Sequence, residues 1–268
     1  LEPAGVPRSL KGTTIPFTYN DLEEITQIVK SNPDLGVIKM EVTRNMGPKV
    51  GYLEGIRKLC DENNIVLIFD ECTSGFRETY GGIHLKFGVE PDMCMFGKAL
   101  GNGYAITAVL GKREIMEAAQ KTFISSTFWT ERIGPSAAVA TLEEMKRIKS
   151  WEIITAQGKK IQEGWKKLAI EKDLELKCAG IPALSTYSIE SENWLKYKTF
   201  ITQEMLKKGW LAGSSVYVCI GHTDSVIENY LNELNPIFKT ISDFEKSQRD
   251  ISELLEGPIS HGGFKRLN

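Results

Sequence analysis

The chemistry of this sequence centres on two charged residues that follow apolar runs. Asp70 comes directly after the run at residues 65–69, and Lys98 lies two positions beyond the run at residues 93–96. A lysine amine can hold an aldehyde as an imine and move protons, and a carboxylate can keep a pyridine-type nitrogen protonated. Parallel strands present their carboxyl ends at one edge of a sheet, so we expect both side chains there, together with Glu41 after a third such run.

Each of these residues, taken alone, has an ordinary explanation. An aspartate after a strand commonly caps the next helix, and most loop lysines are solvated charges. Three glycines, Gly97, Gly101 and Gly103, could cradle a phosphate, but they lack the helix start and the distal acid of a dinucleotide fingerprint. A nicotinamide-binding domain and a protein without catalysis therefore remain open alternatives at this point.

The longer pattern around these residues resembles a known family. Residues 67–77 read LIFDECTSGFR, residues 88–92 read GVEPD, and residues 96–103 read FGKALGNG. Together they resemble the signature of class III aminotransferases, most of all the glutamate-1-semialdehyde aminomutase branch, and the resemblance runs over residues 5–231. It implies the cofactor pyridoxal 5'-phosphate (PLP) and the α/β fold of type I PLP-dependent transferases. In that fold a large domain holds a mostly parallel sheet, and a smaller α+β domain follows it.

The resemblance also implies roles for four residues. Asp70 would pair with the pyridine nitrogen, and Lys98 would form the imine with the cofactor. Thr127 resembles a threonine that reaches across a dimer interface to the neighbouring subunit's cofactor phosphate, so a homodimer with its active site at the interface is expected. Asn45 resembles an asparagine near the cofactor's phenolic oxygen, although its segment is one residue shorter than the family's and lacks the proline after Glu41.

Four further residues that could do chemistry are better explained as structural. Glu41 and Arg77 are expected to be structural partners rather than reactants. His84 and His222 stand in no metal-ligand spacing and beside no nucleophile, and we expect His222 and its neighbours to cap the following helix. No metal site is expected.

Hydrophobic periodicity places helices between the strands. Asn20 and Glu23 form a capping-box-like pair before the first helix. Strands are expected at residues 36–40, 65–69, 93–96, 105–110, 184–189 and 216–220, and further helices at 51–63, 136–148, 151–172, 195–207, 224–239 and within 245–268. Apolar strands separated by helices imply a parallel sheet buried on both faces. After Pro135 the pattern changes to long helices and then smaller α+β elements, so residues 1–158 are predicted to form the large domain and residues 159–268 the small one.

Bulk composition disfavours several classes of protein. With 33 basic and 35 acidic residues among 268, the chain lacks the positive excess that binds nucleic acid or an anionic membrane surface. No apolar run approaches the ~20 residues of a membrane span. Five scattered cysteines are typical of reduced, mostly buried thiols. A cytoplasmic protein that acts on small molecules is therefore expected.

The predicted activity is transfer of an amino group from an amino donor to a small aldehyde or ketone, including keto-sugar-like compounds. Two departures from the family keep alternatives open. The family's first portion has no counterpart here; it supplies a loop that binds the cofactor phosphate and an aromatic residue stacked on the ring. Its absence from this sequence predicts weak cofactor binding. It also leaves open a catalytically silent paralogue that serves as a binding module. Residues 212–217 lack a glutamate of the aminomutase pattern, so 2,1-aminomutase activity is the second alternative.

Overall fold

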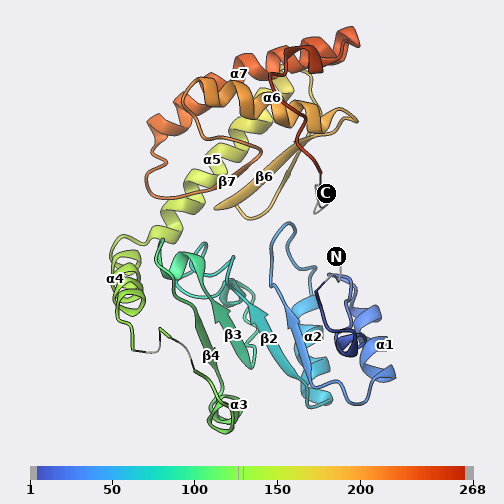
Figure 1. Ribbon diagram of the computed structural model, residues 1–268, viewed down its shortest axis with the longest axis vertical. Helices are drawn as coiled ribbons and strands as arrows, with labels where there is room; N and C mark the ends of the chain where they lie inside the picture. Colours follow the sequence, from blue (N-terminus) through green and yellow to red (C-terminus); the bar gives the residue numbers. More distant parts are fainter. Residues whose placement is uncertain (1–4, 126, 129, 263–268) are drawn as a thin grey trace.

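The computed structural model describes residues 5–262 except residues 126 and 129, and its strands form two separate sheets (Figure 1). Sheet A has the order β1 (Val37–Met40), β2 (Val66–Asp70), β3 (Met93–Phe96) and β4 (Ala108–Gly111). Its first three strands run parallel, and β4 is antiparallel to β3. Sheet B is antiparallel and consists of β5 (Leu176–Ala179), β6 (Leu184–Ile189) and β7 (Ser215–Tyr217). The expected mostly parallel sheet and smaller α+β part are confirmed.

Helices connect the strands, and most of their bounds agree with the periodicity to within about three residues. The α-helices are α1 (Leu22–Ser31), α2 (Tyr52–Glu62), α3 (Arg113–Met116), α4 (Ile133–Ile148), α5 (Ser150–Glu171), α6 (Trp194–Lys207) and α7 (Asp224–Ser247). The 3-10 turns are η1 (Arg8–Leu10), η2 (Ile83–Lys86), η3 (Lys98–Leu100), η4 (Glu117–Lys121) and η5 (Ile251–Leu254).

Sheet A has a well-covered face and an open face. On the covered face α1 and α2 pack against a row of buried strand residues, Ile38, Met40, Leu67, Phe69, Cys94 and Phe96. Successive strand residues point to opposite faces, so their neighbours form the open face. These neighbours are exposed or half-buried: Val37, Lys39, Val66, Ile68 and Asp70. The prediction of burial on both faces is wrong within the described part of the chain, because no described helix covers the second face as α1 and α2 cover the first.

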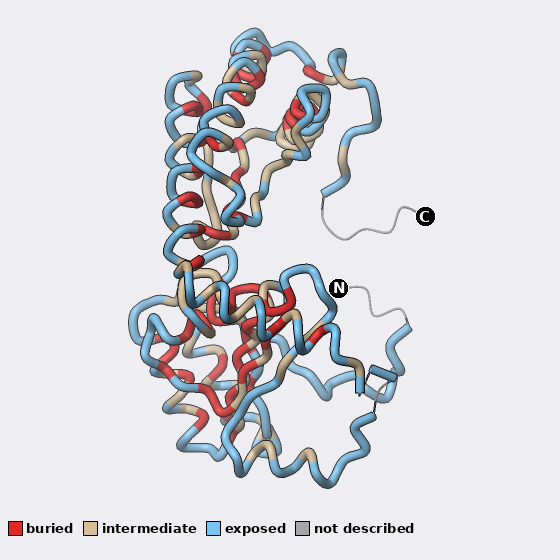
Figure 2. Tube along the Cα trace, turned by 90° about the vertical axis from the view of Figure 1, so that its left-hand side faces the viewer, coloured by how far each residue is buried: buried red, intermediate tan, exposed pale blue. Residues whose placement is uncertain are grey.

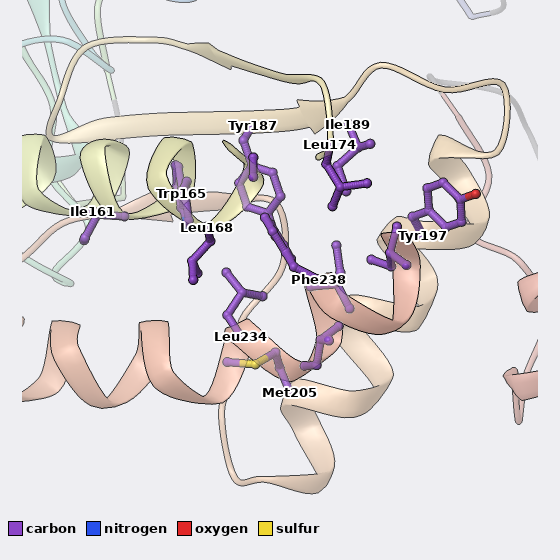
Figure 3. Close-up of a cluster of buried hydrophobic side chains, with 14 of the residues drawn as sticks. Ile161, Trp165, Leu168, Leu174, Tyr187, Ile189, Tyr197, Met205, Leu234 and Phe238 are labelled. Carbon is purple, nitrogen blue, oxygen red and sulfur yellow. The ribbon is translucent and has the colours of Figure 1, made fainter. Parts of the chain in front are cut away.

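A second core lies between sheet B and the helices α5, α6 and α7 (Figure 3). The Tyr187 ring on β6 lies 4.6 Å from the Trp165 ring and 5.9 Å from the Phe238 ring, measured between centroids. Buried residues of this core come from residues 154–251, whereas those of the first core come from residues 25–138. The burial colours of Figure 2 show the two groups as separate zones. The domain boundary at residue 158 stays a prediction.

The start of α1 differs from the sequence-based prediction. Asp21, not Asn20, caps the helix, because the Asp21 side chain accepts the backbone N–H of Glu24 at 2.9 Å. Asn20 has a φ of 69° and binds the loop after β1 instead. Its side chain donates to the backbone oxygen of Gly47 at 3.0 Å and accepts the backbone N–H of Lys49 at 2.8 Å.

Two differences occur in the second half of the chain. Strand β5 is not predicted by the periodicity, because alternation over its first three residues is too short to distinguish a strand from a loop. The additional helix expected within residues 245–268 is wrong for residues 245–262. There α7 continues to Ser247, and only the turn η5 follows it. Residues 263–268 lie outside the described residues.

Two expectations from composition concern the state of the cysteines and the presence of a membrane-spanning helix. All five cysteines are free thiols: Cys60 and Cys94 are buried, Cys72 and Cys178 are half-buried, and Cys219 is exposed. None of the described helices combines the length and apolar character that a membrane crossing needs.

Candidate active site

Asp70 ends β2 at the carboxyl edge of the parallel strands. Its Oδ2 accepts a hydrogen bond from Lys39 Nζ at 2.7 Å, and its Oδ1 accepts the backbone N–H of Cys72 at 3.1 Å. Burial raises the pKa of Asp70, but the bonds from Lys39 and Cys72 outweigh burial and hold this pKa below its ordinary value of 3.8. Asp70 is therefore an anion at neutral pH, with both oxygens already engaged.

Lys98 lies on the adjacent turn, close to Asp70. Asp70 pairs in register with Met95, and Lys98 follows Met95 by three residues. The Lys98 Nζ donates to the hydroxyl of Thr73 at 2.5 Å, and Thr73 follows Asp70 by three residues. Burial raises the pKa of the Cys72 thiol, Asp70 adds to the rise, and the Lys98 charge opposes it. The strand register and the Lys98–Thr73 hydrogen bond thus bring the turns that carry the two predicted residues together.

The backbone around Lys98 is unusual. Its φ of 46° lies in the left-handed region, which non-glycine residues adopt rarely and often at functional sites. The turn closes tightly after it, because a Cβ on Gly101 would lie 2.1 Å from the backbone oxygen of Tyr104. Gly101 is therefore required for the close approach of two backbone segments, which holds the Lys98 turn in place.

A buried set of hydrogen bonds around Glu71 fixes the turn that follows β2. Glu71 is fully buried, and its Oε1 lies 2.9 Å from His84 Nδ1 and accepts the His84 backbone N–H at 3.0 Å. Its Oε2 accepts the Ser74 hydroxyl at 2.5 Å. Burial raises the pKa of Glu71, but the bonds from His84 and Ser74 outweigh burial and lower this pKa below the ordinary 4.5. His84 therefore has a structural partner, and these hydrogen bonds of Glu71 stabilise the turn that carries Thr73.

Asn45 lies in the exposed loop that follows β1. It lines a hollow of about 520 Å³ whose other lining residues include Lys39 and Glu41. The Asn45 backbone oxygen accepts the N–H of Gly180 at 3.1 Å, which ties this loop to the start of the turn before β6. Asn45 and the lysine that binds Asp70 thus border the same hollow.

Glu41 and Arg77 have separate partners. Glu41 forms an ion pair with Arg44 at 3.5 Å. The Arg77 guanidinium lies 5.7 Å from the centroid of the Tyr217 ring, and burial lowers the pKa of Arg77. Arg77 thus connects the turn after β2 to sheet B.

Thr127 and His222 do not join the Asp70 and Lys98 cluster through any described hydrogen bond. Thr127 is exposed in a turn between η4 and α4, and its predicted role across a dimer interface stays a prediction. His222 accepts the backbone N–H of Cys219 at 3.0 Å, whereas Thr223 caps α7. The cap therefore comes from the neighbour of His222.

Sequence reasoning missed Lys39 and Thr73. A signal for Lys39 was available, because a charge interrupts an otherwise apolar run and a lysine in a strand of this kind requires a partner. Thr73 offered no comparable signal. Its contact with Lys98 depends on how the turns after β2 and β3 meet, and the positions 73 and 98 are far apart in the sequence.

This geometry can be compared with that of known proteins. Residues 42–217 match the family described as Aminotransferase class-III. The chain belongs to the class III aminotransferases. It is 34% identical to a 3-aminobutyryl-CoA aminotransferase of Cloacimonas acidaminovorans over 82% of this chain and 56% of that protein. It is 29% identical to a glutamate-1-semialdehyde 2,1-aminomutase of Ignicoccus hospitalis over 89% of this chain and 62% of that protein.

A solved structure shares the fold of this class III aminotransferase chain. The FumI protein of Sphingopyxis sp. MTA144, in its PLP internal aldimine form, superposes with a TM-score of 0.85 at 23% identity. The match covers 94% of this chain and 63% of that protein. The chain therefore spans less than two thirds of the length of each of these relatives. The type I fold expected from the sequence is confirmed.

Class III aminotransferases use PLP, and the residues present suit that cofactor. An anionic carboxylate at one strand end and a lysine amine on the next turn are the two groups that a pyridine nitrogen and an aldehyde need. The described residues contain no group of three or more His, Cys, Asp or Glu side chains placed to hold a metal ion.

Proposed function

We propose that this chain carries the lysine and the aspartate of a PLP-dependent aminotransferase. The observation that supports this most is geometric: Asp70 and Lys98 come from adjacent strand ends, and the Lys98 amine donates to Thr73, three residues after Asp70. The transferred group would move from an amino donor to a small aldehyde or ketone, including keto-sugar-like compounds. A homodimer and a cytoplasmic location are part of the proposal.

The residues divide the work between them. Bound PLP supplies an electron-poor ring that stabilises negative charge on the substrate carbon. The anionic Asp70 keeps the ring nitrogen protonated, and the Lys98 amine holds the cofactor and moves a proton from and to the substrate carbon. Thr73 orients the Lys98 amine through its 2.5 Å hydrogen bond. Asn45 is proposed to lie near the phenolic oxygen, and Thr127 at the phosphate of the neighbouring subunit.

A 2,1-aminomutase is the second candidate, because one relative at 29% identity has that name. An aminomutase moves the amino group within one molecule and needs no separate donor. Assays of carbonyl acceptors with and without an amino donor such as glutamate separate the two activities. Turnover that depends on the donor supports the aminotransferase.

Borohydride reduction tests the central assignment. Reduction of the purified protein with PLP should fix the cofactor on the peptide that contains Lys98, as read by mass spectrometry. Lys98→Ala should remove this label and lower turnover by at least about 1000-fold, because the imine and the proton transfer are lost together. Lys112→Ala, which changes an exposed lysine at the opposite end of β3, should keep both.

Two results would contradict the assignment. A reducible label that persists in Lys98→Ala would show that another lysine holds the cofactor. A titration of PLP into the wild-type protein that gives only the absorption of free PLP, with no new visible-range band, would favour a silent paralogue that acts as a binding module.

A further inference from the structure

Lys39 occupies an unusual place for a charged residue. It lies in the middle of β1, between Ile38 and Met40, which are both buried in the first core. Its side chain points to the open face of sheet A and is 51% exposed. On that face its ammonium binds Asp70, the residue proposed to hold the ring nitrogen, at 2.7 Å.

The register of the sheet explains why this contact forms. Lys39 pairs with Ile68 across β1 and β2, and Asp70 follows Ile68 by two residues on the same face. A lysine side chain is long enough to cover this offset. The ion pair is therefore built into the pairing of two parallel strands, with the charged lysine end free to reach the carboxylate.

Asp70 has capacity for one more donor. Lys39 uses one site on Oδ2, the N–H of Cys72 uses one on Oδ1, and the Cys72 thiol takes a third. A carboxylate offers about four lone-pair sites, two on each oxygen. The Asp70 side chain is 21% exposed, so one of these sites can accept a ring N–H without release of Lys39.

We propose that Lys39 is a positioning residue that stays bound to Asp70 and shares this carboxylate with the ring nitrogen of the cofactor, which lowers the pH at which that nitrogen loses its proton. This inference rests on the proposed function. It assigns to Lys39 control of the ring's charge, whereas Lys98 holds the cofactor and moves protons.

The physical basis is repulsion between like charges that share one anion. Two charged or titratable side chains affect the pKa of Asp70: Lys39 from β1 and Cys72 from the turn after β2. Lys98, from the turn after β3, affects the pKa of Cys72. The Lys39 ammonium weakens the field that Asp70 exerts on a protonated ring nitrogen. Because Lys39 is half exposed, solvent screens this effect, and we expect a shift of about one pH unit.

Two substitutions at Lys39 test the inference. Lys39→Met removes the charge and keeps the length, so the pH midpoint of the bound cofactor's absorption should rise by about one unit. The PLP dissociation constant should fall about tenfold, since Asp70 is no longer shared. Lys39→Arg keeps the charge and should restore the wild-type midpoint. In the protein without PLP, carboxyl carbon NMR should show a higher pKa of Asp70 in Lys39→Met.

Lys112 provides a matched control. Its ammonium lies 2.7 Å from the Asp92 carboxylate and its side chain is 47% exposed, so the lysine has nearly the same contact distance and exposure as Lys39 but lies at the amino end of β3. Lys112→Met should leave the cofactor midpoint, the PLP affinity and the pKa of Asp70 unchanged. A change in all three would point to a general loss of charge instead of an effect at Asp70.

The outcomes separate this inference from the proposed function. A midpoint that is the same in wild type and Lys39→Met overturns the inference, even if PLP affinity rises, because Lys39 would then leave Asp70 when the cofactor binds. The proposed function survives that result as long as borohydride still labels Lys98. Failure to label Lys98 would instead reject the proposed function, whatever the Lys39 variants show.

Discussion

The core of residues 154–251 and the open face of sheet A differ in how far they bury their side chains. In the core, aromatic and aliphatic side chains such as Trp165 and Phe238 are buried on all sides between sheet B and three helices. On the face of sheet A that the described helices leave open, Asp70 at the end of β2 forms an ion pair with Lys39 of β1. The first region excludes water, and the second exposes charge.

This contrast separates stability from chemistry. Burial of a large apolar side chain contributes about 1.5–3 kcal/mol, which makes the closed core a main source of folding free energy. A half-exposed ion pair contributes at most about 1 kcal/mol, so the charges on the open face add little to stability. The role proposed for Asp70 requires this access, because a carboxylate that binds a ligand cannot be buried on every side.

The largest effect on stability is expected in the core. Phe238→Ala should lower the free energy of unfolding by about 3–5 kcal/mol, because Phe238 is fully buried and its truncation would leave a cavity in the core. Chemical denaturation measures this loss. Phe123→Ala is the matched control, since Phe123 is 95% exposed and the same truncation should cost less than about 0.5 kcal/mol. Equal losses in both variants would remove the contrast between the regions.

Two aspartates at opposite ends of the sheet sharpen the contrast. Asp70→Asn should lower turnover about 100-fold, since the ring nitrogen loses its anion, and should change the free energy of unfolding by less than about 1 kcal/mol. Asp92 is buried and accepts bonds from Arg57, Lys112 and the Leu67 N–H. Asp92→Asn should therefore cost about 1–3 kcal/mol of stability and leave the cofactor link intact.

The reverse pattern, with Asp70 needed for folding and Asp92 for turnover, would place the site at the wrong end of sheet A. Steady-state rates and denaturation curves on both variants, with borohydride labelling of Lys98, decide between the two patterns.

The last prediction concerns how the contribution of Glu71 to stability depends on pH. The folded-state pKa of Glu71 lies below its ordinary value of 4.5, so its stabilisation is fully present above that value and is lost as the pH falls through the lowered folded pKa. Glu71→Gln should cost about 1–3 kcal/mol at neutral pH, because the bonds to His84 and Ser74 lose their charge. This difference from wild type should shrink in acid. A difference that stays constant across the acid range would show that the Glu71 charge is not what fixes the turn.

Much of the fold follows from local patterns. The apolar runs of β2 and β3 and the helical periodicity of α1 and α2 are readable because each reflects a backbone geometry that repeats within a few residues. The short strand β5 was not predicted, because its pairing with β6 in sheet B, and not its own composition, makes it a strand. The cap of α1 was misassigned because Asn20 is engaged by a distant loop.

For the site, the sequence by itself predicted that Asp70 and Lys98 carry the chemistry, because both stand after strands whose carboxyl ends meet at one edge of a parallel sheet and lie in a pattern that resembles the class III aminotransferases. Only the tertiary structure decided what those two residues touch. The Lys39 and Asp70 ion pair depends on strand register, and the Thr73 and Lys98 bond depends on the meeting of two turns. Such contacts join positions that are far apart in the chain, and no local periodicity encodes a distance across a sheet.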